Sequence, residues 1–572
     1  MEPEQKKRRI AILGGGPSGL FIYKRFVESG NTDFEIEIFE KHSELGAGMP
    51  YSKYGANDEH VTNVSDNEIP QIVNSIEEWI QTAPKTILER FDVDPQRFNE
   101  YKVLPRLLFG QYLSGQFKLL QDLALEGGIS TRVHYESTVT DIIDDPANDQ
   151  VLVEIAGGDK MRFDTVVICT GHNWPVKREG IIPGYFDAPY PPAKLALNLN
   201  HTIAIKGSSL TAIDAIRTLA RHNGSFEKDA DGKLSFKINS ASPNFKMVMH
   251  SRSGMLPAVR FHLEDSHLSN DSLLTEEEID LHRRGNGGFL SLDFVFQKDF
   301  KELFREKDAE FYNRIKDWDI EQFVEEMMQL RENLEPFQLF KAEYVQAEKS
   351  IKRHQSIYWK EMLAVLSFAM NYPAKYLSAE DMQRLQKVLM PLISIVIAFV
   401  PQRSCIELLA LHDAGVLDII AVGSDSTIEP QTTGGIIYHF KDGNTTKSIH
   451  YKTFVDCVGQ PHLSYAEFPF KSLISQKAIS PARLQFQSAE LGQVAFENGN
   501  KAVEKDNNDN YYLNVSGISI NDNFQIIDQY GAYNSRIYIM AVPYIGGFNP
   551  DYSGLDFCEA ASAHIIKNIG VS

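Results

Sequence analysis

The chain has 572 residues, of which 43% are hydrophobic and 23% are charged. This composition is typical of a globular protein of roughly two to four domains, and it excludes a disordered chain. Lys and Arg number 57 against 77 Asp and Glu, which gives a net charge of -20. We therefore expect neither nucleic acid nor an anionic membrane surface as a partner.

The cysteine pattern excludes a paired-cysteine zinc site and a dithiol redox motif, because no C-x-x-C is present. The cysteines are widely spaced: Cys169, Cys405, Cys457 and Cys558. This usage fits a reducing compartment. The most apolar run, Met390 to Val400, is too short to span a bilayer, and Met1 to Arg9 has no secretory pattern. We expect a soluble cytoplasmic protein.

The first residues predict a β-turn-α-β unit. An apolar strand over 10–13 runs into the turn GGGPSG, residues 14–19, and a helix pattern follows to Phe26 and ends near Gly30. A second strand over 34–39 ends at Glu40. This order is the opening unit of a dinucleotide-binding domain.

Each glycine of the motif Gly14-x-Gly16-x-x-Gly19 has a mechanical role. Gly14 permits the tight turn, Gly16 lets the backbone approach a pyrophosphate, and Gly19 lets helix and strand pack closely. The helix N-terminus attracts the phosphates, and Glu40 is placed to accept hydrogen bonds from ribose hydroxyls. The alternative is a glycine-rich turn without a ligand.

A second unit begins with a strand over 203–206 and the turn Gly207-Ser208-Ser209, followed by a helix over 210–221. Another strand over 246–250 ends at Ser251-Arg252. Arg252 stands where an acidic residue would favour NAD, and an arginine there can bind a 2′-phosphate, so NADP(H) is favoured over NAD(H). The alternative is a nucleotide fold that holds no nucleotide.

Later segments favour FAD over NAD at the first turn. A strand over 166–169 closes on Thr170-Gly171-His172, and similar segments follow over 454–459 and 537–542. A helix from about Gly554 to Asn568 would direct its N-terminus at the flavin. We expect these late strands to return to the first domain; the alternative is that they are only sheet edges.

The predicted fold class is α/β, with two dinucleotide-binding (Rossmann-like) domains of three-layer ββα architecture and a mostly helical insertion. Strands over 417–422, 435–440 and 448–454 alternate like antiparallel strands. The predicted domains are an FAD-binding domain over 1–200 completed by 454–572, an NAD(P)-binding domain over 201–265 completed by 401–453, and the helical insertion over 266–400. The insertion is interpreted as a packing domain, with a substrate lid as the alternative.

Two groups of side chains have weaker interpretations. His262-x-Glu264-Asp265-x-His267 fits no zinc or iron spacing, so we expect a polar loop and no metal. His172 and Trp174 would line the junction between the domains or serve as packing residues.

The motifs as a set resemble a family of bacterial FAD/NAD(P)-binding flavoproteins, which is similar in domain plan to flavin-dependent N-hydroxylating monooxygenases. The segments that carry the resemblance are LGAGMPYS (45–52), Asn63, EIP (68–70), LPRLLFGQY (104–112), TGHNWP (170–175), SLTAID (209–214) and SRSGMLP (251–257). The resemblance implies FAD contacts at Arg106 and at the Gly171 turn, besides the first glycine motif. Two features depart from the pattern of these families. Ser209 stands where the second fingerprint has its middle glycine, and the F-x-G-x-x-x-H signature of many flavin monooxygenases is absent.

The combined interpretation is an FAD-dependent, NADPH-using oxidoreductase, foremost a monooxygenase that hydroxylates a small amine or sulfur compound through a flavin C4a-hydroperoxide. The alternatives are an NAD(P)H-dependent flavin reductase or oxidase without oxygen insertion, and a flavin- or nucleotide-binding sensor. No catalytic side chain and no oligomeric state are assigned. The predicted cofactor contacts are Gly14, Gly16, Pro17, Ser18, Gly19, Glu40, Lys41, Gly48, Met49, Asn63, Arg106, Gln111, Val139, Thr170, Gly171, His172, Gly207, Ser208, Ser209, Thr211, Arg252, Gly554 and Leu555.

Overall fold

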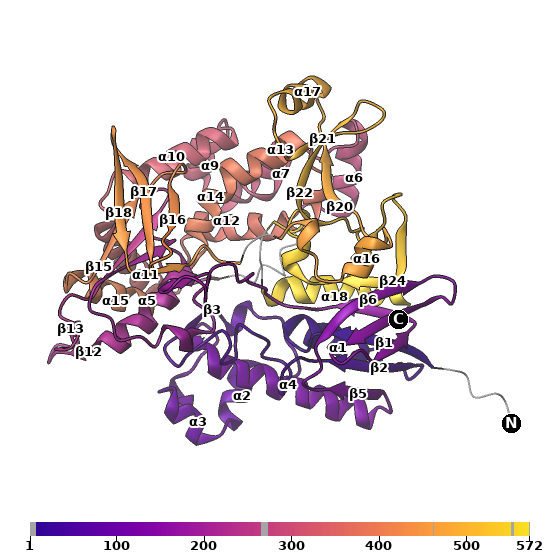
Figure 1. Ribbon diagram of the computed structural model, residues 1–572, viewed down its shortest axis with the longest axis horizontal. Helices are drawn as coiled ribbons and strands as arrows, with labels where there is room; N and C mark the ends of the chain where they lie inside the picture. Colours follow the sequence, from indigo (N-terminus) through magenta and orange to yellow (C-terminus); the bar gives the residue numbers. More distant parts are fainter. Residues whose placement is uncertain (1–6, 265–272, 461–462, 551–553, 571–572) are drawn as a thin grey trace.

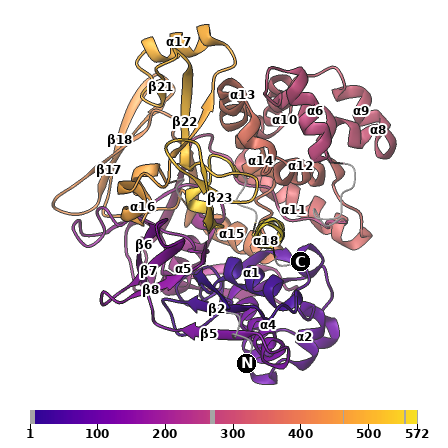
Figure 2. The same cartoon turned by 90° about the vertical axis from the view of Figure 1, so that its right-hand side faces the viewer.

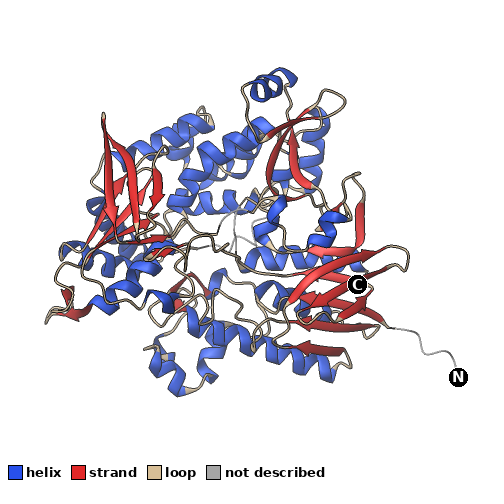
Figure 3. Cartoon of the chain, in the orientation of Figure 1, coloured by secondary structure: helices blue, strands red, loops and turns tan. Residues whose placement is uncertain are grey.

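The structure, a computed structural model, describes residues 7–264, 273–460, 463–550 and 554–570. Two mainly parallel sheets lie toward opposite ends of the long axis, and a helical region stands above and between them (Figure 1). Figure 3 shows how the helices gather in that region. The predicted fold class is confirmed: the chain is α/β, with two dinucleotide-type sheets and a helical middle region. Within the described ranges, no helix is long and apolar enough to cross a membrane.

The first sheet has the order β23-β24-β9-β1-β2-β5. Its strands are β1 (Arg8–Leu13), β2 (Phe34–Phe39), β5 (Ser130–His134), β9 (Thr165–Ile168), β23 (Gln525–Ile527) and β24 (Tyr533–Ile539). Strand β1 lies between β2 and β9, parallel to both. Residues 10–13 of β1 are fully buried, which explains the unbroken apolar run in the sequence.

Helices and a small sheet cover this first sheet. The helices of this part of the chain are α1 (Pro17–Glu28), α2 (Ile76–Thr82), α3 (Lys85–Arg90), α4 (Arg106–Glu126) and α18 (Leu555–Ile569). The antiparallel meander of β6 (Val139–Asp145), β7 (Gln150–Ile155) and β8 (Lys160–Phe163) packs against β1, β9 and β24. The arrangement is therefore the expected stack of meander, sheet and helices.

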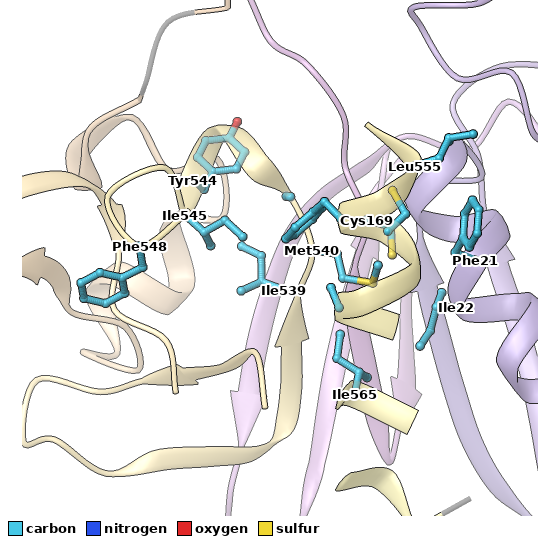
Figure 4. Packing of buried hydrophobic residues seen from close by; sticks show 14 of the residues in the cluster. Phe21, Ile22, Cys169, Ile539, Met540, Tyr544, Ile545, Phe548, Leu555 and Ile565 are labelled. Carbon is cyan, nitrogen blue, oxygen red and sulfur yellow. The ribbon is translucent and has the colours of Figure 1, made fainter. Parts of the chain in front are cut away.

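The late strand β24 and the helix α18 return to this first sheet, as the sequence predicted. β24 pairs in parallel with β9, with Ile537 opposite Val166. Figure 4 shows Phe21 and Ile22 of α1 close to Leu555 of α18, with Cys169 beside them. The first domain is thus assembled from segments that lie more than 350 residues apart in the chain.

The second sheet has the order β10-β19-β11-β14-β15, and every pairing in it is parallel. Its strands are β10 (Tyr185–Phe186), β11 (Thr202–Lys206), β14 (Lys246–Ser251), β15 (Leu417–Ala421) and β19 (Thr453–Asp456). Helices α5 (Leu210–Asn223) and α15 (Gln402–Asp413) cover one face of this sheet. The other face is covered by the antiparallel strands β16 (Thr427–Pro430), β17 (Ile436–Asp442) and β18 (Thr445–Tyr451).

Two strand predictions were wrong. The segment over 454–459 was expected in the first sheet, but β19 pairs with β11 in the second, because only Lys452 separates it from β18 and leaves no chain to reach the other sheet. The segment over 417–422 was expected to be antiparallel, but β15 is parallel to β14. Helix α15 connects back onto the sheet before β15, and such a crossover gives parallel strands. The prediction of antiparallel strands is confirmed for β17 and β18. The domain boundaries stay a prediction.

The middle region is built from helices α6 to α14, grouped above α18 in Figure 2. They are α6 (Glu276–Gly285), α7 (Leu292–Asp299), α8 (Phe304–Lys307), α9 (Ala309–Ile315), α10 (Ile320–Glu332), α11 (Pro336–Arg353), α12 (Tyr358–Ala369), α13 (Ala379–Arg384) and α14 (Met390–Val396). The remaining elements are β3 (Val61–Ser65), β4 (Val103–Pro105), β12 (Gly224–Lys228), β13 (Leu234–Ile238), α16 (Lys471–Ser475), β20 (Pro481–Gln485), α17 (Ala489–Glu497), β21 (Val503–Lys505) and β22 (Tyr511–Ile518).

A buried charge cluster joins three middle helices. The carboxylate of Glu343 on α11 accepts from Arg331 on α10 at 2.7 Å and from Lys360 on α12 at 2.7 Å. Burial alone would raise the pKa of Glu343, but the two cations outweigh it and hold the pKa below its ordinary value. Arg331 also donates to the carbonyl of Leu256 at 3.0 Å, which ties the middle region to the chain that follows β14.

Replacing Glu343 with alanine should destabilise the protein by about 3–5 kcal/mol, because two buried cations lose their partner. Chemical denaturation followed by far-UV circular dichroism measures this. The exposed Glu325→Ala on α10 is the matched control and should change the unfolding free energy little. Equal stability of the two variants would contradict the assigned role of the cluster.

Candidate functional site

The turn between β1 and α1 depends on glycines that have no room for a side chain. Gly14 has a φ of +112°, and a Cβ there would lie 2.6 Å from the carbonyl oxygen of Cys169 on the neighbouring strand segment. A Cβ on Gly19 would lie 2.1 Å from the carbonyl oxygen of Gly14. The roles predicted for these two glycines, a tight turn and close helix packing, agree with this geometry.

A third glycine, which the sequence analysis passed over, is equally constrained. A Cβ on Gly15 would lie 2.2 Å from the side chain of Leu45. The N–H of Gly15 donates to Glu40 at 2.9 Å, and its carbonyl accepts from Gly46 at 2.7 Å. The loop after β2 is therefore docked onto the turn.

This docked loop brings further predicted residues to the turn. A Cβ on Gly16 would lie 3.2 Å from the Cα of Gly48. Met49 follows it and is half-buried, whereas Lys41 is exposed. Glu40 is buried, and besides Gly15 it accepts from the backbone N–H of His42 at 2.9 Å. The bond from Gly15 fixes the Glu40 carboxylate beside the turn.

Two buried polar atoms next to this turn have no partner among the described residues. They are Oγ1 of Thr170 and Nδ1 of His172, both in the segment that follows β9. Burial lowers the pKa of His172, so its imidazole is neutral near pH 7. A buried polar group without a hydrogen bond is costly. A bound dinucleotide at the turn would supply the missing partners, so the residues present fit such a group.

The N-terminus of α18 meets the same sheet edge. Its N-cap is Gly554, which is exposed and makes no side-chain capping bond, and Leu555 is buried in the core. Cys558, one turn further, lies 3.5 Å from the hydroxyl of Ser18 on α1, which follows Pro17 at the start of that helix. The positive ends of α1 and α18 therefore both face the region beside Thr170, where a negative charge would be stabilised.

Three predicted contacts lie further from the turn and stay predictions. Asn63 is on β3, where its carbonyl accepts from Arg260. Gln111 is on α4 with an exposed side chain, and Val139 begins β6. Gly171 lies between Thr170 and His172 in the segment after β9.

The second turn repeats the geometry of the first. Gly207 has a φ of +107°, and a Cβ there would lie 2.8 Å from the carbonyl oxygen of Cys457 at the end of β19. Ser208 donates to the carbonyl of Met255 at 2.8 Å, which ties the turn to the chain after β14. Ser209 is the N-cap of α5 and is exposed.

Two further predicted contacts flank this second turn. Thr211 is in the first turn of α5, and Arg252 follows β14 with an exposed side chain. The carboxyl ends of β11 and β14 are neighbours in the parallel sheet, so the turn and Arg252 share one edge. The residues present at this edge fit a phosphorylated nucleotide.

Two connecting segments run side by side between the sheets. Asn173 donates its N–H to Oε1 of Gln460 at 2.8 Å and accepts from Nε2 of Gln460 at 2.7 Å. Trp174 donates to the carbonyl of Gly459 at 3.1 Å. The rings of His172, Trp174 and Tyr190 form a row with centroid separations of 5.5 and 5.1 Å.

This row ends at a buried ion pair between the two dinucleotide units. Arg106 at the start of α4 pairs with Asp214 of α5 at 2.5 Å, and Tyr190 donates to the same carboxylate oxygen at 2.8 Å. Burial would raise the pKa of Asp214, but the charge of Arg106 and the hydrogen bond from Tyr190 outweigh it and hold the pKa low. Arg106, which the resemblance implied as an FAD contact, thus has Asp214 as its partner.

His60 completes this cluster as a neutral group. Its Nδ1 accepts from the backbone N–H of Asn57 at 3.1 Å, so Nε2 carries the proton and lies 3.2 Å from the carbonyl oxygen of Asp214 and 3.1 Å from Oγ1 of Thr218. Burial lowers the pKa of His60, which agrees with this tautomer. Sequence reasoning missed Tyr190 and His60; Asp214 stood in a quoted motif but without a role.

Other reactive groups are not arranged for chemistry of their own. All four cysteines are buried and free, and burial raises the pKa of each thiol. Across the described ranges, no group of three or more His, Cys, Asp or Glu side chains could hold a metal. Asp265 and His267 of the considered loop lie outside those ranges, and His262 packs against the rings of Tyr101 and His354.

Comparison with known proteins bears on this arrangement. Residues 11–173 match a family model described as FAD-NAD(P)-binding, and residues 275–397 match one described as a YdhS-like middle domain. The uncharacterized protein YdhS of Escherichia coli (strain K12) is 28% identical over 477 residues, which are 82% of this chain and 86% of the relative. A thiol-specific monooxygenase of Saccharomyces cerevisiae is 29% identical over 171 residues, which are 29% of this chain and 34% of that protein.

Among solved structures, a bacillithiol disulfide reductase from Staphylococcus aureus has a TM-score of 0.42 at 10% identity, covering 99% of this chain and 98% of its own. The cadaverine monooxygenase DfoA from Erwinia amylovora also has a TM-score of 0.42 at 10% identity, covering 98% of this chain and 94% of its own. Because both TM-scores lie below 0.5, neither likeness bears on function. The match over 11–173 confirms the predicted FAD- and NAD(P)-binding class, and with it an FAD-dependent oxidoreductase.

Replacing Gly16 with alanine should lower the flavin content of the purified protein about tenfold, since a Cβ would stand between the backbone and the pyrophosphate. Visible absorbance per mole of protein measures this, and the far-UV circular dichroism should not change. Gly285→Ala is the matched control, because a Cβ there meets no atom within 4 Å. Full flavin content in the Gly16 variant would contradict the assigned site.

Replacing Asp214 with alanine should destabilise the protein by about 3–5 kcal/mol, because Arg106 is left buried without an acidic partner. Since the folded pKa of Asp214 is depressed, its contribution is present at neutral pH and is lost as pH falls below about 4. Urea unfolding at pH 7 and at the lowest pH where the protein folds measures the difference. If the difference in unfolding free energy between the parent and the variant is as large at low pH as at pH 7, the assigned role of Asp214 is contradicted.

Proposed function

We propose that the protein is an NADPH-dependent flavin monooxygenase that oxidises a small nucleophilic amine or sulfur compound. The observation that carries the proposal is the pair of orphaned atoms on Thr170 and His172 beside a turn that has no room for side chains. A second turn of the same geometry supports a second nucleotide. The yeast relative is named for oxygenation of thiols, which favours a sulfur or similar nucleophile.

The first unit would hold FAD. The backbone of Gly14 to Gly19, with Gly48 and Met49 over it, would receive the pyrophosphate, and Glu40 would accept from the ribose. Thr170 to His172 and the N-terminus of α18 at Gly554 would border the flavin ring. Bound FAD would supply the redox chemistry that side chains lack, taking a hydride and passing electrons to O₂.

The second unit would hold NADP(H). Gly207 to Ser209 and Thr211 would receive its pyrophosphate, and the exposed Arg252 would bind the 2′-phosphate. The ion pair of Arg106 with Asp214 would fix the angle between the units, so that the two dinucleotides meet. The neutral imidazole of His172 and the ring of Trp174 would keep water out of this junction.

Three experiments separate this function from its alternatives. The purified protein should be yellow, and NADPH should reduce the bound flavin rapidly in an anaerobic stopped-flow instrument. Under ¹⁸O₂, label should appear in the oxidised organic product. Fast reduction without label in any organic product would instead identify a reductase or oxidase, and no reduction at millimolar NADPH would identify a sensor.

Replacing Arg252 with alanine should raise the KM for NADPH about tenfold or more, because a charge-assisted bond to the 2′-phosphate is lost. The KM for NADH should stay unchanged, since NADH lacks that phosphate. Steady-state kinetics with both coenzymes measure this, and the exposed Arg353→Ala on α11 is the control. Equal effects on both coenzymes would exclude Arg252 as the phosphate contact.

A further inference from the structure

A cavity of about 360 Å³ lies between the middle helices and α18. Its walls come from the start of α6, the end of α7, the end of α12 with the chain after it, residues 520–524 and 548–549, and one face of α18. In Figure 2 the middle helices stand directly above α18. The volume is in the range of small-molecule sites, and the cavity is formed only where the middle region meets the first domain.

The cavity starts close to the predicted flavin. Phe557, Ala561 and His564 line it from α18, and Gly554 is the N-cap of that helix. At 1.5 Å per residue, Phe557 lies about 4.5 Å along the axis from the N-cap and His564 about 15 Å. A molecule in the cavity could therefore extend from the middle helices to the flavin.

Most of the wall is apolar, and one buried acid stands out. Leu274, Ile279, Phe368 and Phe524 give the cavity a hydrophobic lining. Asp299, the last residue of α7, also lines it and is only 2% exposed. Its Oδ1 accepts from the N–H of Leu274 at 2.8 Å. Among the described residues, no basic side chain lies within ion-pair distance of its carboxyl group.

The charged groups in the wall of the cavity favour a ligand with a positive charge. Glu276 is a second acid in the wall. The single lysine there, Lys375, is already neutralised by Asp522 at 2.6 Å. Burial lowers the pKa of His564, which leaves that imidazole uncharged at neutral pH. A buried carboxyl group without a cation is an unfavourable arrangement that a cationic ligand would relieve.

We propose that this cavity binds the substrate, a small molecule with an apolar body and a protonated amine that pairs with Asp299. The inference rests on the proposed function, since the flavin would stand near the N-terminus of α18, the helix that lines the cavity. The amine is the group that anchors the molecule; the atom to be oxidised lies at the end nearer α18's N-terminus.

Binding of 2-phenylethylamine to the flavin-loaded protein, measured by isothermal titration calorimetry, tests the site. Asp299→Asn should weaken it about tenfold or more, since the charge is lost while the bond from Leu274 is retained. Glu277→Gln is the matched control, because this exposed acid in the first turn of α6 does not line the cavity. The uncharged 2-phenylethanol should bind both proteins equally.

A filling variant checks the location independently of charge. Ala560→Phe should block the amine and the alcohol alike while flavin content stays normal, because Ala560 lines the cavity from α18. No binding of the amine to the parent protein, or equal binding by the parent and Asp299→Asn, would overturn the site even if NADPH reduces the flavin. Binding that depends on Asp299, without labelled sulfoxide from the thioether amine 2-(phenylthio)ethylamine under ¹⁸O₂, would keep the site and refute the monooxygenase.

Amine binding should also strengthen between pH 6 and 8. Burial raises the pKa of Asp299 to about 7, against the lowering effect of the hydrogen bond from Leu274; Glu278 raises this pKa and Lys298 lowers it by smaller amounts. The carboxyl group is therefore neutral at pH 6 and charged at pH 8, while the amine stays protonated. Glu276, Lys375 and His564 also face the cavity; protonated His564 at low pH would act in the same direction. A flat pH profile would speak against Asp299 as the anchor.

Discussion

Both dinucleotide units depend on one constraint, the close approach of a glycine to the carbonyl of a cysteine on the adjoining strand segment. Gly14 faces Cys169 and Gly207 faces Cys457, in each case with no space for a Cβ. This close approach places the glycine turn beside the segment that follows the neighbouring strand of the sheet. In the first unit that segment carries Oγ1 of Thr170 and Nδ1 of His172, two buried atoms that have no partner among the described residues.

The two units are held to each other by polar contacts that place their turns in one junction. Arg106 reaches Asp214 across 108 residues of sequence, and Gln460 is bonded to Asn173 across 287. The middle helices meet α18 of the first unit at the proposed substrate cavity. A substrate cavity that lies between the domains would have all of its chemistry in the cofactors, which explains why no catalytic acid-base pair is evident in the sequence.

Local patterns predicted much of this from sequence. The apolar run of β1, the glycines after it and Glu40 after β2 are sufficient to define the first unit, because each is a short-range signal. Long-range pairing was not readable: β19 joins the second sheet, Gly15 is confined by Leu45, and Asp299 lines a cavity built from six separate segments. Such placements follow from tertiary packing, which no local pattern encodes.

The most direct test of the central claim is a crystal structure of the protein purified with its own cofactor. Electron density for a pyrophosphate along Gly14 to Gly19, with an isoalloxazine ring against Thr170, His172 and the N-terminus of α18, is the predicted result. Colourless protein with no density at this turn after soaking with FAD would contradict the account.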